Sequence, residues 1–291
     1  MRAVVLDAGG LPELAELPEP TGPGALVHVR ACGLCGSDVE KLGRAGAGTV
    51  LGHEVAGELA DGTPVAVMHR VPCGSCDRCL AGHPSTCAEF AEVRIAPGGF
   101  AERLSATHYV TLPGSFGEHD GIWIEPLACV LRAAELVSPG RTLVVGCGAI
   151  GLLWAQVLIL QGHEVVAADV RPERLAGARE LGALVDDDPV SSAVVTAPAG
   201  TGDALRRLAP GGRLVVFAAW EQPLSISFDG VYRQELSIVG SRSASPAAFA
   251  AAVELLPQLA LPPVTVMPLD RFRQGVELYR RGDALKVAFT P

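Results

Sequence analysis

The sequence contains no asparagine, and among its basic residues only Lys41 and Lys286 are lysines. The absence of asparagine fits a heat-tolerant protein and a biased genome composition equally well, so it decides nothing about function. Long apolar runs are also lacking, because the longest, residues 150–160, is interrupted by Gln156 and is too short to span a bilayer. The formal net charge of −9 at pH 7 argues against a basic nucleic-acid-binding face and a polybasic membrane anchor.

The N-terminal residues show no signal-peptide pattern, because Asp7 interrupts their apolar run almost at once. Without an export signal, the eight cysteines are expected to face a reducing cytosol, where metal binding or catalysis is more common than disulfide formation. We therefore expect a cytoplasmic protein whose cysteines serve chemistry.

The 291 residues are enough for two domains. Residues 1 to about 115 alternate short apolar runs with glycine and proline turns, a pattern typical of a compact, mostly β domain. From residue 126 onward, expected helices alternate with expected strands, and this alternation predicts a parallel, doubly wound sheet.

A glycine-rich turn joins the first strand of the second region, residues 142–145, to a long apolar helix. Its glycines allow a tight turn, close approach to a pyrophosphate and close packing of helix against strand, while the helix N-terminus attracts phosphate. The next strand ends at Asp169, where a carboxylate would bind ribose hydroxyls and repel a 2′-phosphate, so NAD is favoured over NADP. A turn that binds nothing, or another nucleotide, is the alternative. The cofactor-binding candidates are Gly146, Gly148, Ala149, Ile150, Gly151, Asp169 and Arg171.

Four cysteines lie within fifteen residues, at Cys73, Cys76, Cys79 and Cys87. Four thiolates at this spacing can surround one tetrahedral zinc ion, and such a closed site is structural rather than catalytic. A pair of disulfides is the alternative, which the missing export signal disfavours.

A second set of candidate ligands is scattered along the chain. Cys35, Ser37, His53 and Glu54 fall in the β-rich region, and Glu125 lies at its junction with the nucleotide-binding region. Each residue alone is as easily a packing residue. Together, however, a thiolate, an imidazole and a carboxylate would leave one position of a zinc ion open, which is the arrangement of a catalytic site.

The chain resembles the zinc-dependent medium-chain dehydrogenases/reductases, nearest in pattern to the sorbitol and other polyol dehydrogenases. The resemblance rests on CGLCGSD at 32–38, GHE at 52–54, the cysteine lobe at 73–87, EPL at 125–127, the glycine-rich turn, YRQELSIVGS at 232–241 and LKV at 285–287. It implies an α/β protein with a Rossmann domain at residues 126–246. It also implies a mostly β, GroES-like catalytic domain formed by residues 1–125 and 247–291.

By resemblance, Cys35 and His53 ligate the catalytic zinc, and Glu54 and Glu125 occupy family positions for ligating carboxylates. Asp38 matches the carboxylate that holds the histidine ring in the correct tautomer. If the cysteine and both glutamates bound as anions, the site would carry a net negative charge. We therefore expect one glutamate to leave the metal when substrate binds.

Three further positions follow from the resemblance. Lys286 matches a basic position near the coenzyme pyrophosphate. Ser37 would accept the hydroxyl proton of the substrate. Glu40 stands where the family carries a relay histidine, so Glu40 or water must carry the proton onward. The chain is also short for the family, with trimmed loops after Lys41 and after Asp186.

These features predict an enzyme that transfers a hydride between a secondary alcohol and NAD, using one catalytic and one structural zinc. A polyol, sugar or cyclitol is the first expectation for the substrate. The alternatives are a zinc-dependent NAD(P)H reductase of activated carbonyls or conjugated alkenes, and a non-catalytic NADH- and zinc-binding sensor. By resemblance the protein forms a homodimer or homotetramer through the nucleotide domain, along residues 236–239.

The remaining cysteines and most histidines have no partner at ligand spacing. Cys32, Cys129 and Cys147 are interpreted as small buried residues. The histidines interpreted as surface or packing residues are His69, His83, His108 and His119.

Overall fold

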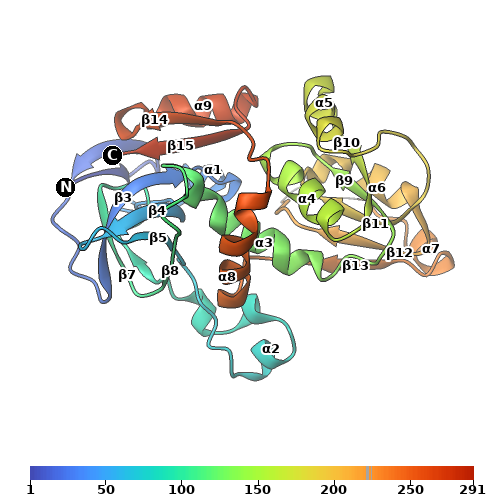
Figure 1. Ribbon diagram of the computed structural model, residues 1–291, viewed down its shortest axis with the longest axis horizontal. Coiled ribbons are helices and arrows are strands. Elements are labelled where there is room, and N and C mark those ends of the chain that lie inside the picture. Colours follow the sequence, from blue (N-terminus) through green and yellow to red (C-terminus); the bar gives the residue numbers. More distant parts are fainter. Residues whose placement is uncertain (221–222, 224) are drawn as a thin grey trace. The chain divides into compact units, whose positions relative to one another are not determined.

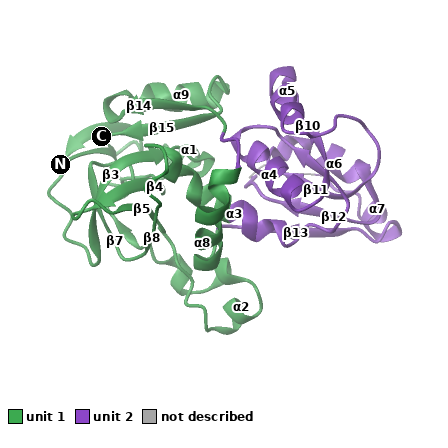
Figure 2. Cartoon of the chain, in the orientation of Figure 1, with its two compact units in different colours: residues 1–128, 244–258, 262–291 green, residues 129–243, 259–261 purple. Residues whose placement is uncertain are grey.

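The computed structural model describes residues 1–220, 223 and 225–291, which form two compact units (Figures 1 and 2). Unit 1 consists of residues 1–128, 244–258 and 262–291, and unit 2 of residues 129–243 and 259–261. Within the described residues, no helix combines the length and the apolar character needed to cross a membrane.

Unit 1 is built mainly of β-strands. Its strands are β1 (Arg2–Leu6), β2 (Pro12–Glu16), β3 (Ala25–Gly33), β4 (Glu54–Leu59), β5 (Pro64–Val67), β6 (Ile95–Ala96), β7 (Arg103–Ala106), β8 (Tyr109–Thr111), β14 (Val264–Pro268) and β15 (Lys286–Thr290). β1 and β2 pair antiparallel, and the others form one sheet with the path β14-β15-β3-β4-β5-β8. β7 also pairs with β3 and with β6. β3 therefore lies beside both the next long strand of the chain and the last one.

Short helices follow or separate these strands. They are α1 (Gly36–Lys41), α2 (Asp77–Leu80), α8 (Pro246–Leu255), α9 (Phe272–Arg281), and the 3-10 turns η1 (Pro84–Thr86), η2 (Glu89–Ala91), η3 (Asp120–Trp123), η5 (Leu256–Gln258) and η6 (Leu269–Arg271). α1 and α9 matter most for the site. α1 starts directly after β3, and α9 carries on its apolar side Phe272 and Val276, which are both buried.

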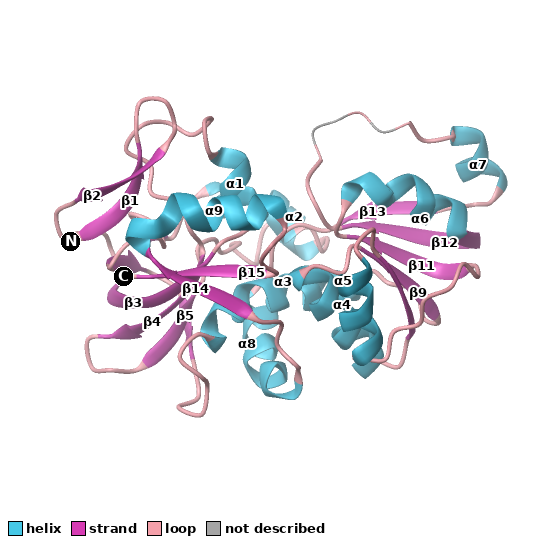
Figure 3. Cartoon of the chain, turned by 90° about the horizontal axis from the view of Figure 1, so that it is seen from above, coloured by secondary structure: helices cyan, strands magenta, loops and turns pink. Residues whose placement is uncertain are grey.

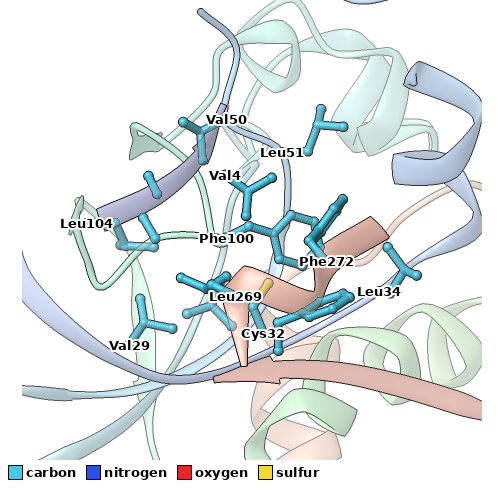
Figure 4. Packing of buried hydrophobic residues seen from close by; sticks show 14 of the residues in the cluster. Val4, Val29, Cys32, Leu34, Val50, Leu51, Phe100, Leu104, Leu269 and Phe272 are labelled. Atoms are coloured by element: carbon cyan, nitrogen blue, oxygen red, sulfur yellow. The ribbon is translucent and has the colours of Figure 1, made fainter. Parts of the chain in front are cut away.

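The core of unit 1 gathers apolar side chains from both ends of the chain (Figure 4). At its centre the ring centroids of Phe100 and Phe272 lie 4.8 Å apart, and Phe289 packs edge-on against Phe100 at 5.5 Å. Aromatic pairs in such tilted contacts add to the free energy gained by burial. The C-terminal strand is thus fixed to the N-terminal half of the unit.

Unit 2 alternates strands with helices (Figure 3). Its elements are β9 (Arg141–Val145), α4 (Ala149–Leu160), β10 (Glu164–Ala168), α5 (Pro172–Glu180), β11 (Val190–Val195), η4 (Pro198–Gly200), α6 (Thr201–Arg207), β12 (Leu208–Val216), α7 (Phe228–Arg233) and β13 (Ser237–Gly240), and α3 (Ile124–Ala134) leads in from unit 1. The strands are all parallel, in the order β10-β9-β11-β12-β13. This confirms the predicted Rossmann-type sheet beside a mostly β domain.

The sheet of unit 2 ends at β10, among the described residues. A six-stranded dinucleotide-binding sheet has the order 3-2-1-4-5-6, and the order here corresponds to that arrangement without its third strand. In its place, Leu184 forms a single parallel bridge with Val166 of β10. Leu184 is 42% exposed. The edge of the sheet at β10, the strand directly before Asp169, is therefore covered by little more than this residue.

Candidate functional site

The four cysteines of the lobe at residues 73–87 are brought together around α2 and η1. The Sγ atoms of Cys76 and Cys79 are 3.6 Å apart, those of Cys73 and Cys87 are 3.6 Å apart, and those of Cys73 and Cys79 are 3.9 Å apart. A disulfide would require sulfur atoms about 2.05 Å apart, and none of the eight cysteines, all of which the structure describes, is in a disulfide. The lobe is therefore a cluster of separate sulfur ligands.

The sulfur spacing fits zinc. Four sulfurs at about 2.3 Å from a central ion, in a tetrahedron, lie about 3.8 Å from one another, which matches the three spacings above. The backbone N–H groups of Ser75 and Cys76 lower the pKa of the Cys73 thiol, which favours its thiolate form. The four residues are one of the two groups of potential metal ligands found among the described residues.

The second group contains three different ligand types from unit 1, and we call it the mixed group: Cys35, His53 and Glu54. Their ligand atoms all lie within 4.8 Å of one another. Cys35 is the residue before α1, and Glu54 begins β4. Antiparallel pairing of Gly33 with Glu54 brings the end of β3 beside the start of β4, so the sheet register itself places the three side chains together.

Asp38 orients the histidine of the mixed group. Its Oδ1 lies 3.2 Å from Nδ1 of His53, and its Oδ2 accepts a hydrogen bond from the Cys35 backbone N–H at 3.2 Å. Because a carboxylate only accepts hydrogen bonds, Nδ1 carries the proton and Nε2 is left for a metal. Burial alone would raise the pKa of Asp38, but the electrostatic interaction with His53 and the hydrogen bonds outweigh burial and lower it.

Glu54 is paired with a lysine from the far end of the sequence. The Lys286 ammonium group donates to Oε2 of Glu54 and, at 3.4 Å, to the carbonyl oxygen of Leu34, and it lies 5.5 Å from the centroid of the Trp123 ring. The two charged side chains are 3% and 2% exposed. Burial would lower the pKa of Lys286, but Glu54 and then Cys35 outweigh burial and raise it, so the lysine stays charged.

The structure gives Lys286 a partner that the sequence did not predict, because its ammonium group pairs with Glu54 inside unit 1. A buried carboxylate needs a charged partner, and β15 places this lysine beside β3. The expected place of Lys286 near the coenzyme pyrophosphate stays a prediction. The positive charge of Lys286 also offsets the negative charge of Glu54, which is one of the three anions that would make a zinc site there net negative.

The other candidates in unit 1 differ in how exposed they are. Ser37 donates a hydrogen bond from Oγ to Sγ of Cys35 at 3.5 Å. Glu125, near the start of α3, is 8% exposed, and it lies outside the three residues whose ligand atoms fall within 4.8 Å. It still raises the pKa of Lys286 electrostatically. Glu40 is exposed on α1.

Two further polar side chains lie near the mixed group: His69, which the sequence analysis interpreted as a surface or packing residue, and Tyr279, which it did not name. The ring centroid of His69 lies 4.7 Å from that of His53. Desolvation, then the charges of His53 and Arg70, lower the pKa of His69 well below its ordinary value. The Tyr279 hydroxyl lies so close to Gly36 that a Cβ on that glycine would be 3.0 Å from it. The available signal was that His69 follows a buried strand, at the sheet edge that also holds His53.

The glycine-rich turn of unit 2 has little room for side chains. Gly146 has φ = +91°, and a Cβ on Gly151 would lie 1.8 Å from the carbonyl oxygen of Gly146. By contrast, the nearest atom to a Cβ on Gly148 would be Nη1 of Arg174, at 3.8 Å. α4 begins at Ala149 and no side chain caps its N-terminus, so the N–H groups of Ala149, Ile150 and Gly151 are suitable for a pyrophosphate.

Asp169 closes the turn. Its Oδ2 accepts the backbone N–H of Cys147 at 2.7 Å, and its Oδ1 accepts that of Arg171 at 2.9 Å. Nη1 of Arg174 lies 4.0 Å from Oδ2. The turn thus presents a fixed carboxylate, with the backbone of Arg171 bonded to it. This is the chemistry that suits two ribose hydroxyl groups. Of the unassigned cysteines, Cys32 and Cys147 are buried and Cys129 is half-buried.

Two family models match the chain. Residues 22–114 match the alcohol dehydrogenase GroES-like domain, and residues 149–258 match the zinc-binding dehydrogenase domain. The first match contains both groups of potential metal ligands, and the second begins inside the glycine-rich turn.

Relatives cover most of the chain. It is 33% identical to D-altritol 5-dehydrogenase of Agrobacterium fabrum, with 84% of each chain covered. It is 29% identical to galactitol 1-phosphate 5-dehydrogenase of Escherichia coli, with 83% of each covered. The crystal structure of galactitol-1-phosphate dehydrogenase from Escherichia coli superposes with a TM-score of 0.85 at 28% identity, covering 100% of both chains.

Proposed function

This chain belongs to the zinc-type medium-chain alcohol and polyol dehydrogenases, and from that premise we propose that it transfers a hydride between a secondary hydroxyl group of a polyol and NAD. The observation that carries the proposal is the mixed group, in which a thiol, an imidazole and a carboxylate lie within 4.8 Å of one another in unit 1. A separate four-cysteine lobe already offers a closed site, so the mixed group is available for catalysis.

The mixed group fits a catalytic metal because its three potential ligands would leave one position of a tetrahedral zinc ion open. We propose that Cys35, His53 and a carboxylate hold one zinc ion, and that the cysteine lobe holds another. Glu54 is the carboxylate inside the group, and Glu125 is the alternative at the family position. A zinc ion there would act as a Lewis acid on the substrate hydroxyl, and bound NAD would accept the hydride.

The chain's own residues account for orientation and for the proton. Asp38 fixes the His53 ring through Nδ1. The Ser37 hydroxyl, hydrogen-bonded to Cys35 at 3.5 Å, is placed to accept the substrate's proton. Glu40 follows Ser37 by three residues on α1, hence on the same side of the helix, and it is exposed. We propose that the proton leaves from Ser37 toward Glu40 or solvent.

NAD is favoured over NADP by the carboxylate of Asp169. Both of its oxygens are held by backbone N–H groups, which keeps the negative charge at the end of β10. A 2′-phosphate would meet that charge, whereas ribose hydroxyls can donate hydrogen bonds to it. Arg171 and Arg174 lie nearby and offset part of the repulsion.

A substrate panel tests the proposed function. Polyols, sugars and cyclitols are assayed with NAD and with NADP, on protein whose zinc content has been measured, and an enone is included to detect reductase activity. We expect polyol-dependent reduction of NAD and about two zinc ions per chain. Enone reduction without alcohol oxidation would support the reductase alternative. No more than one zinc per chain, with no turnover, would refute both.

We also propose a homodimer or homotetramer that pairs along β13. β13 is an edge strand of the unit 2 sheet, and Ile238 on it is 41% exposed. Edge strands present unpaired backbone groups that a second copy can complete. Light scattering coupled to size exclusion measures the assembly. A monomer at micromolar concentration would contradict the proposal.

A further inference from the structure

His69 is a polar side chain beside the mixed group that the mechanism leaves unused. It follows β5 by two residues, and its ring is tilted by 44° against the ring of His53 at a centroid distance of 4.7 Å. His53 is also hydrogen-bonded to Asp38 through Nδ1. The imidazole of His69 therefore contacts a proposed metal ligand directly, within unit 1.

The ring nitrogens of His69 have no hydrogen-bond partner in the part of the chain that the structure describes. Neither nitrogen is among the described side-chain atoms that are both fully buried and without a hydrogen-bond partner, so both keep access to solvent. A neutral imidazole has one donor and one acceptor, and both can bond to a hydroxyl group that replaces solvent there. This is the chemistry of a group that binds a ligand hydroxyl.

The position of the ring does not depend on its nitrogens. The His69 carbonyl oxygen accepts the Arg94 backbone N–H at 2.8 Å. Arg70, the next residue, donates from Nη1 to the carbonyl oxygen of Phe90 at 2.8 Å, and its guanidinium lies 5.9 Å from the centroid of the Phe90 ring. The backbone on both sides is thus anchored, and the nitrogens remain available to a ligand.

We propose that the His69 imidazole binds a second hydroxyl group of the substrate, and so makes the site select polyols over alcohols with a single hydroxyl. The inference rests on the proposed function and deepens it. Adjacent hydroxyl groups of a polyol are carried by carbon atoms that are bonded directly to each other. A polyol whose reacting hydroxyl lies at the mixed group therefore carries its next one within reach of a ring that touches His53.

A matched substrate pair tests this assignment: 2,3-butanediol and 2-butanol differ by one hydroxyl group. We expect His69→Phe, which keeps a ring of similar shape, to raise KM for the diol about three- to tenfold and to leave KM for 2-butanol within about twofold. His69→Gln, which retains a donor and an acceptor, should recover part of the diol preference. His108→Phe, at an exposed histidine of the same unit, should change neither value.

Binding is measured as well as turnover. Titration of the enzyme–NADH complex with the diol, followed by nicotinamide fluorescence, should show the same three- to tenfold weakening in His69→Phe, while zinc content stays equal to that of the wild type. His69→Leu serves if the phenylalanine variant does not fold. Parallel changes for both alcohols, or unchanged diol affinity, would overturn the assignment. A wild type that oxidises no member of the substrate panel refutes the proposed function instead, and the fluorescence titration alone then decides the role of His69.

Discussion

The four-cysteine lobe takes all of its sulfur atoms from residues 73–87, whereas the mixed group takes its ligand atoms from residues 35, 53 and 54 and its charge partner from residue 286. The lobe therefore depends on one loop and the short helix α2. The mixed group depends on the register of β3 against β4 and on the position of β15 beside β3.

The two groups also differ in where their hydrogen-bond and ion-pair partners come from. The sulfurs of the lobe hydrogen-bond to one another and to nearby backbone N–H groups, so the lobe is complete in itself. Each member of the mixed group instead has an outside partner: Ser37 for Cys35, Asp38 for His53 and Lys286 for Glu54. A closed site stabilises, while a site held from behind can keep one side for substrate.

Cys35→Ser should have the largest effect and separates the two groups most clearly. Loss of the thiolate removes a ligand of the mixed group only, so turnover should fall by about a thousandfold or more while NADH binding persists. Zinc should drop by about one ion per chain. Steady-state assay, NADH fluorescence titration and metal analysis measure these. Loss of NADH binding together with turnover would mean that Cys35 is structural.

Asp38→Asn tests the support behind the mixed group. The amide cannot hold the proton on Nδ1 of His53 as a carboxylate does, so metal affinity or kcat should fall about ten- to a hundredfold. Competition with a zinc-binding dye measures the affinity. The lobe should keep its zinc throughout. Unchanged affinity of the mixed group would show that the hydrogen bond at 3.2 Å has no role in orienting the ring.

Lys286→Met leaves Glu54 buried without its counter-charge. We expect a loss of about 3 kcal/mol in unfolding free energy, which is recovered in part when Glu54→Gln is added. Lys41→Met is the matched control, because Lys41 is the other lysine of the chain and is exposed. Chemical denaturation measures all four proteins. Equal stability of the two lysine variants would contradict the role given to the buried pair.

Cys76→Ser should affect stability more than catalysis. Removing one sulfur opens the lobe and weakens its zinc, so Tm should fall by roughly 5–10 °C while kcat of the zinc-loaded enzyme stays within about twofold. Cys129→Ser, outside both groups, is the control. Thermal denaturation and initial rates measure these. A large fall in kcat with unchanged Tm would reverse the assignment of structural and catalytic sites.

A substitution of Glu102 should have the smallest effect on thermal stability, and it serves as a reference for the other substitutions. Its carboxylate accepts from Nε and from the backbone N–H of Arg2, both at 2.8 Å, and the side-chain hydrogen bond of Arg2 lowers its pKa. A lowered folded pKa contributes stability that is present above the ordinary carboxylate pKa and is lost as pH falls through the folded value. Glu102→Gln should lower Tm by about 1–2 °C at pH 7. In thermal scans this difference should shrink once pH falls below the ordinary carboxylate pKa of about 4.3, and it should vanish only after pH has passed the lowered folded pKa.

Much of the fold followed from periodicity, since the strand–helix alternation of unit 2 is a local pattern. The strand β4 did not, and residues 54–59 were not predicted as a strand. Gly57 interrupts the apolar pattern there, and charged residues stand near both ends. The structure explains the glycine, since a Cβ on it would lie 2.5 Å from the carbonyl oxygen of His28. Close approach of the neighbouring strand, which sequence patterns do not report, selects this residue.

The cysteine lobe could be read from spacing because all of its atoms come from one short segment. The pairing of Glu54 with Lys286 could not, because 232 residues separate them and only the sheet brings them together. His69 was interpreted as a surface or packing residue for a similar reason. Its place after a buried strand was the one signal in the sequence, and its contact with His53 arises only because β4 and β5 pair in the sheet.

The separation along the chain has a consequence for biosynthesis. During translation, the four thiols of the lobe are all outside the ribosome once residue 87 has emerged, so the lobe can capture its metal early. The charge of Glu54 is balanced only after residue 286 has also been synthesised. In nascent chains the proposed zinc site of the lobe would therefore be complete before the mixed group is assembled, and premature stops upstream of β15 would yield fragments that bind metal through the lobe but are inactive.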